Sequence, residues 1–151
     1  MSTATPVRTD ARALITEGLF GRLVDRIVKD EQITELLAER IVTDALAFLA
    51  ACGANQGSTL APSEQVDIGW HTFLMYTEEY ADFCSRVAGR FIHHSPADLP
   101  GVSYEPKATT RLRSMAAMRA LGYEPFPGLW GSTAECSQCH DGCSNSNYAG
   151  K

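Results

Sequence analysis

Histidine residues are the most informative side chains of this 151-residue chain, because three of its four histidines fall in one region. Asp67 and His71 are four residues apart, so on a helix they lie on one face, one turn from each other. His93 and His94 follow in an irregular segment that is long enough to fold back toward that face. Such sets of imidazoles and a carboxylate suit iron, copper or zinc. These four residues are the first predicted metal-ligand set; the alternative is a solvated acidic face that carries a histidine.

A second candidate set lies in the sequence CSQCHDGC, which contains Cys136, Cys139, His140 and Cys143. A C-x2-C pair is typical of zinc knuckles and of dithiol redox sites. A fourth ligand would be His140, or else Cys52 or Cys84. C-x-x-C-H is also the attachment signature of c-type haem, but the N-terminus lacks the apolar stretch of an export signal, so we do not expect haem. The remaining interpretations are delivery of a soft metal and a flexible polar terminus.

Apolar residues recur at helical spacing in four stretches, and no stretch alternates as a strand does. The predicted helices begin after Thr9-Asp10, near Ile33, at Ser63 and at Lys107. We therefore predict an all-α fold, with an irregular bundle of about four helices and a proline-rich loop in residues 1–131. An extended, cysteine-containing tail follows at residues 132–151. The aromatic segment YEPFPGLWG is expected to pack across the bundle.

The third predicted helix is expected to run without a break from Ser63 to Gly89. On that helix Tyr80 and Cys84 lie on the apolar face, whereas Asp67 and His71 lie on the opposite face. Thirteen residues separate His71 from Cys84, which is about 20 Å along a helix axis, so the two cannot share one ion. Cys84 is therefore predicted to be a buried core residue. Asp67, His71 and Tyr80 are the candidate catalytic residues.

Composition and charge exclude two classes of partner. The chain has a formal net charge of −5 and no basic stripe, so nucleic acid is not an expected partner. Its longest apolar run, ALAFLAAC, is far shorter than the roughly 20 residues of a membrane span. Without an export signal, the expected location is the cytoplasm.

Three segments, VDIGWHTFLMYTEEYADFC, GRFIHH and GYEPFPGLW, resemble the glycine-rich-domain-protein-like family, a domain of unknown function. The similarity covers about residues 60–130. By position, the matching residues are Asp67, Trp70, His71, Tyr80, His94, Pro127 and Trp130. The resemblance implies that His71 and the His93-His94 segment belong to one feature. The chain departs from the pattern in its lack of a glycine-rich extension and in its cysteine-containing tail.

Three functions are compatible with these residues. The first is a metal-binding helical protein that, if catalytic, is a metal-dependent oxidase or hydrolase acting on a thiol or a peptide, with the tail closing its site. The second is a non-catalytic module that binds a protein or peptide through a surface of Trp70, Phe126 and Trp130. The third is a metal carrier or modified-peptide precursor in which the tail is the functional part. Converging Asp67, His71 and His94 side chains would favour the first, and an exposed aromatic patch the second.

Overall fold

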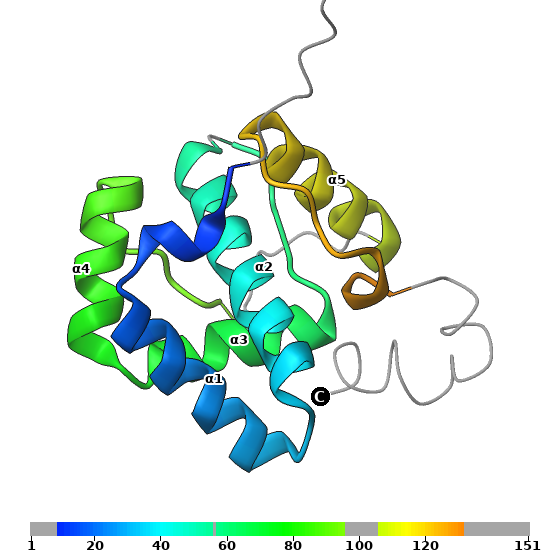
Figure 1. The fold of residues 1–151 in the computed structure, drawn as a ribbon. Coiled ribbons are helices and arrows are strands. Elements are labelled where there is room, and N and C mark those ends of the chain that lie inside the picture. The colour runs from blue at the N-terminus through cyan, green and yellow to red at the C-terminus, as the bar shows by residue number, and fades with distance from the viewer. Residues whose placement is uncertain (1–8, 56, 96–105, 132–151) are drawn as a thin grey trace, which may run out of the picture.

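The computed structural model describes residues 9–55, 57–95 and 106–131, and these contain helices and irregular segments but no strand (Figure 1). The all-α prediction is therefore confirmed. Five α-helices are present rather than about four, because one predicted helix is divided. In chain order the elements are η1 (Ala11–Leu14), α1 (Glu17–Glu31), α2 (Glu35–Ala54), α3 (Glu64–Leu74), α4 (Thr77–Ala88), α5 (Lys107–Ala120) and η2 (Pro127–Leu129).

α2 is the central helix, and α1, α3, α4 and α5 all contact it (Figure 1). Its residues from Asp44 to Ala51 are buried without interruption. A helix that is apolar on every side must be covered on every side, which accounts for its place in the fold. α3 lies close against α2 at Gly69, where an added Cβ would lie 2.8 Å from the Cβ of Ala45. The absence of a side chain at this position therefore sets the distance between the two helices.

The predicted continuous helix from Ser63 to Gly89 is wrong, because the chain bends at Met75 and Tyr76 between α3 and α4. A straight helix of that length would measure about 37 Å, longer than the roughly 30 Å of α2 that it must cover. The bend lets both halves pack on the core: Phe73 of α3 and Tyr80 of α4 meet edge to face with ring centroids 5.1 Å apart. The predicted ends are confirmed, since Ser63 caps α3 and Gly89 ends α4 in the left-handed conformation.

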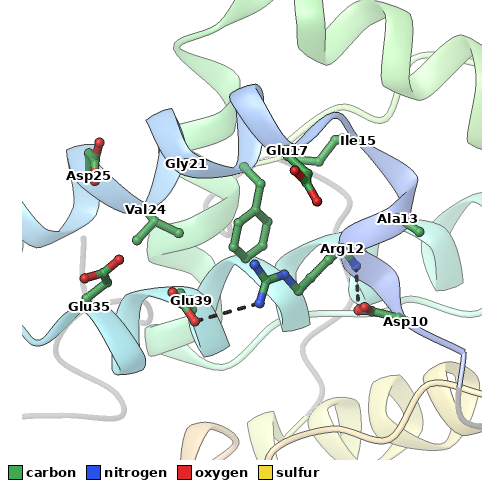
Figure 2. A pocket seen from close by; sticks show the side chains of 11 residues that line it. Asp10, Arg12, Ala13, Ile15, Glu17, Gly21, Val24, Asp25, Glu35 and Glu39 are labelled. Atoms are coloured by element: carbon green, nitrogen blue, oxygen red, sulfur yellow. Dashed lines mark hydrogen bonds and ion pairs between the residues drawn. The ribbon is translucent and has the colours of Figure 1, made fainter.

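The first predicted helix is also interrupted near its start. Asp10 caps the short helix η1 by accepting a hydrogen bond from the backbone N–H of Arg12. The chain is then extended at Ile15 and Thr16, and the Thr16 hydroxyl caps α1. η1, α1 and α2 together border a surface groove (Figure 2). None of the described helices is long and apolar enough to cross a membrane.

The segment after α5 packs across the bundle as predicted, and a buried carboxylate on α2 holds it. Asp44, which is 1% exposed, accepts hydrogen bonds on Oδ2 from the backbone N–H of Phe126 and from Nε1 of Trp130, both at 2.9 Å. Burial raises the pKa of Asp44 to about 6, because the charged form loses hydration; the two N–H donors partly offset this effect. Asp44 thus links the centre of the core to the segment that leads into the tail.

Candidate functional site

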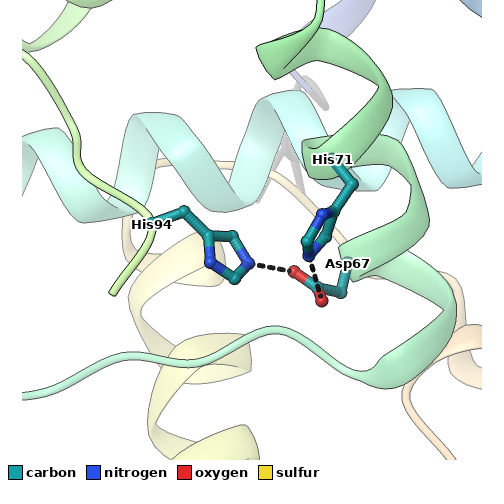
Figure 3. Close-up of side chains that lie close together, drawn as sticks. All are labelled: Asp67, His71 and His94. Carbon is teal, nitrogen blue, oxygen red and sulfur yellow. Dashed lines mark hydrogen bonds and ion pairs between the residues drawn. The ribbon is translucent and has the colours of Figure 1, made fainter. Parts of the chain in front are cut away.

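Asp67, His71 and His94 converge at one place on the surface of α3 (Figure 3). Nε2 of His94 lies 2.8 Å from Oδ1 of Asp67, and Nε2 of His71 lies 3.1 Å from Oδ2 of the same carboxylate. The two imidazole rings meet edge to face with centroids 4.4 Å apart. One ligand atom from each residue can be chosen so that all three lie within 4.8 Å of one another. The carboxylate therefore stands between two imidazoles that both direct Nε2 toward it.

The exposure of the three side chains gives the cluster an inner and an outer side. Asp67 is 17% exposed and His94 25%, whereas His71 is 60% exposed. Asp67 lies in the first turn of α3, where the helix dipole favours a negative charge. His71 lies one turn further along, so α3 alone fixes two of the three groups. The solvent side of the cluster is open next to His71.

His94 reaches the cluster because a buried hydrogen-bond chain holds the segment that carries it. The Tyr80 hydroxyl accepts a hydrogen bond from Nε1 of Trp70 at 2.9 Å and donates one to the carbonyl of Ile92. The ring of Trp70 also packs against that of His94, with centroids 4.3 Å apart. Burial raises the pKa of Tyr80 above its usual value, so the phenol stays protonated and can donate. Tyr80 thus connects α3, α4 and the histidine segment.

Replacing Tyr80 with phenylalanine should loosen the His94 segment while leaving the helices in place. The change leaves the Trp70 N–H and the Ile92 carbonyl without their shared partner, at a cost of about 2 kcal/mol in unfolding free energy. Hydrogen exchange at residues 90–95 should accelerate relative to α2 in the same protein. Tyr123→Phe, which removes the hydroxyl of another buried tyrosine, is the matched control. Unchanged exchange at residues 90–95 in Tyr80→Phe would show that the hydroxyl does not hold this segment.

The remaining candidates lie outside the cluster. His93 is exposed and its ring packs against Phe91, with centroids 4.8 Å apart, because neighbouring side chains of an extended segment point to opposite sides. Tyr80 is buried beneath the cluster, where it acts as a support and has no access to solvent. Cys84 is fully buried, as predicted, and its Sγ accepts the backbone N–H of Ile92 at 3.5 Å. The four residues of the second set, Cys136, Cys139, His140 and Cys143, lie outside the described residues.

Two further observations bear on the other predicted functions. Trp70 and Trp130 are 7% and 2% exposed and belong to the core, and Phe126 is partly buried against it, so these three residues do not form the exposed aromatic surface expected of a peptide-binding module. Burial raises the pKa of the Cys52 thiol to about 12, so without a metal this cysteine stays protonated at neutral pH.

Sequence reasoning missed Asp44 and the supporting role of Tyr80. A signal for Asp44 was present, since it is the one acidic residue within the apolar stretch IVTDALAFLAAC. A charged residue inside a buried run is rarely left without a partner. No sequence signal indicates that the partner is the Trp130 indole, 86 residues further along the chain. The role of Tyr80 depends on the bend between α3 and α4, which was not predicted.

Together the fold and the cluster define a small all-α domain that carries two histidines and one carboxylate at a shared surface site. The sequence profile of the UCP032817-like family matches residues 12–119, a range that includes all three residues. The chain belongs to this uncharacterised family. The match does not support the glycine-rich-domain-protein-like name that the sequence resemblance suggested. No curated protein and no solved structure matches the chain.

Proposed function

We propose that this protein binds a divalent transition metal ion through Asp67, His71 and His94. The observation that carries the proposal is the convergence of these three side chains from two separate segments of the chain. Two imidazoles and one carboxylate on one side of an ion are a common donor set for Fe²⁺ and for catalytic Zn²⁺. Without a thiolate, the set does not select Cu(I).

The distances within the cluster support this proposal. Ligand atoms that lie 2.0–2.1 Å from one ion are about 2.9 Å apart at octahedral angles and about 3.4 Å apart at tetrahedral angles. The two nitrogen–oxygen distances, 2.8 Å from His94 to Oδ1 of Asp67 and 3.1 Å from His71 to Oδ2, are close to these values. An ion at this place would displace any proton shared between the imidazole nitrogens and the carboxylate. His71, as the most exposed of the three, has room for the small rotation that this exchange requires.

The open side of the cluster supports a reactive site rather than a closed structural one. A structural zinc site usually has four protein ligands, whereas a catalytic site keeps a position for water or substrate. Here three protein groups face one side, and exposed His71 borders solvent. A metal bound there would supply Lewis acidity or activate a water or dioxygen molecule, which are the chemistries of a hydrolase and an oxidase. The protein's own contribution is the fixed spacing of the three ligands.

The test is the metal content of anaerobically purified, untagged protein, followed by calorimetric titration of metal-free protein with Zn²⁺ and Fe²⁺. We expect one ion per chain in the wild type and in His93→Ala, and none in Asp67→Asn, His71→Ala or His94→Ala. The pair His93→Ala and His94→Ala is a matched comparison, because the two residues are neighbours and only His94 belongs to the cluster. Circular dichroism should show that all variants keep their helices.

Three outcomes would contradict the proposal. If the wild-type protein takes up neither ion, the three residues only form hydrogen bonds that connect α3 to the His94 segment. Metal that is lost only when the chain is truncated before Ser132 would place the ligands in the second candidate set. A variant lacking both His71 and His94 that still binds one ion would lead to the same conclusion.

A further inference from the structure

A second feature of the surface lies apart from the histidine cluster, in the groove between η1, α1 and α2 (Figure 2). The groove has a volume of about 610 Å³. Its floor is apolar and consists of Ile15, Phe20 and Val24, all of which are buried members of the core. The floor alone would suit any apolar side chain, so the identity of an occupant depends on the charges at the rim.

The rim of the groove is strongly acidic. Five carboxylates and a single guanidinium line it, so it carries most of the net charge of −5 of the whole chain. The carboxylates come from both walls: α1 and the residue before η1 supply three, and α2 supplies two (Asp10, Glu17, Asp25, Glu35 and Glu39). An apolar floor between acidic walls is complementary to a segment with both apolar and cationic side chains.

The chain itself shows how this groove receives a cation. The guanidinium of Arg12 lies over the Phe20 ring, 4.2 Å from its centroid, and 3.8 Å from the Glu39 carboxylate (Figure 2). A cation above an aromatic face and beside a carboxylate is stabilised by both groups. Beyond Arg12, toward Asp25 and Glu35, the groove offers further carboxylates.

Gly21 allows the groove to be blocked without disturbing the fold. It lies in the wall of the groove, and Figure 2 labels it on α1 between Glu17 and Val24. An added Cβ at Gly21 would meet nothing within 4 Å among the described residues, as at Gly18 on the same helix. A larger side chain at Gly21 can therefore occupy the groove without a clash inside the protein.

We propose that this groove binds a short basic segment of a partner protein that carries both arginine or lysine and a large apolar residue on one face. From Glu17 to Asp25, α1 extends about 12 Å, which matches about four residues of extended peptide. The apolar side chain would rest on Val24, next to the Phe20 ring that Arg12 covers, and the cations would lie against the acidic walls. A contact this small belongs with transient interactions and would be weakened by salt.

The proposal can be tested by fluorescence anisotropy with a labelled six-residue peptide of two arginines, two leucines and two arginines in that order, so that each face of the extended chain carries both kinds of side chain. A peptide with glutamate in place of arginine is the charge control. We expect Gly21→Leu to weaken binding at least about tenfold without lowering the melting temperature, because leucine is a better helix former than glycine. Gly18→Leu is the matched protein control, since Gly18 lies on the same helix with equally free space and does not line the groove.

A triple variant with Glu17, Asp25 and Glu35 changed to their amides should bind more weakly and with less salt dependence. Equal binding by wild type and Gly21→Leu would overturn the proposal, as would equal binding of the two peptides. Analytical ultracentrifugation tests whether the groove instead binds a second copy of this chain. Self-association of the wild type that Gly21→Leu abolishes would assign the groove to a second copy of this chain, and so would also overturn it.

Discussion

The stability of the wild-type protein should fall by about 3 kcal/mol between pH 4 and pH 6 because of Asp44 alone, and an Asp44→Asn variant should lack this loss. The pKa of Asp44 is raised from its ordinary value of 3.8 to about 6 in the folded protein. Between these two values the unfolded chain has released its proton while the folded chain retains it. Raising the pH through this window therefore favours unfolding, and above about pH 6 the difference stays constant.

Asparagine at this position is always neutral and keeps one oxygen that can accept the N–H groups of Phe126 and Trp130. The measurement is urea unfolding of both proteins from pH 4 to pH 8, followed by Trp fluorescence. The difference between the two stability curves removes the contribution of all other carboxylates. Glu78→Gln, which changes an exposed carboxylate of α4, should instead follow the wild-type curve. Parallel curves for wild type and Asp44→Asn would mean that Asp44 is charged throughout this range.

Enlarging Gly69 should cause a large loss of stability. An added Cβ would lie 2.8 Å from the Cβ of Ala45 and 3.0 Å from the carbonyl oxygen of Ile41. Neither contact involves the flexible end of a side chain, so α3 must move away from α2. We expect Gly69→Ala to cost about 2 kcal/mol and Gly69→Val about 3 kcal/mol or more, despite the better helix propensity of alanine.

The same substitutions should affect the candidate metal site, because Asp67 and His71 lie two residues to either side of Gly69. Moving α3 would carry both away from His94, which is held by a different segment. Urea unfolding and Zn²⁺ titration should therefore report parallel losses in Gly69→Ala. Gly18→Ala has free space around the new methyl group and should stabilise the protein by up to about 1 kcal/mol. If Gly69→Ala unfolds at the same urea concentration as the wild type, α3 can move away from α2 without a loss of stability.

Much of the fold could be predicted from the sequence because its determinants are local. The caps at Ser63 and Gly89, the helix from Lys107 and the absence of strands all follow from residue type and spacing. The bend at Met75 and Tyr76 has no glycine or proline to signal it. It results from the limited length of the core that α3 and α4 must cover, which is a property of the packed structure.

The candidate site shows the same division between local and distant determinants. The pairing of Asp67 with His71 was predicted because helical periodicity alone brings them together. Spacing alone could not decide which of the two vicinal histidines would join them, although the family resemblance matched His94. That choice depends on the direction of an extended segment, which Tyr80 sets through the Ile92 carbonyl. The packing of α4 therefore determines that His94 points toward Asp67 and His93 toward Phe91.

The hydrogen bond between Asp67 and His94 joins residues 27 positions apart, and this separation has a thermodynamic consequence. In the unfolded chain the two groups are rarely near each other, so an ion that needs both binds the native state far more tightly than the unfolded state. Ligand concentration and conformational stability then become linked quantities: each tenfold rise in free ion above its dissociation constant adds about 1.4 kcal/mol to the unfolding free energy. If the proposed ion binds here, the unfolding free energy of the protein would rise with the logarithm of the free ion concentration.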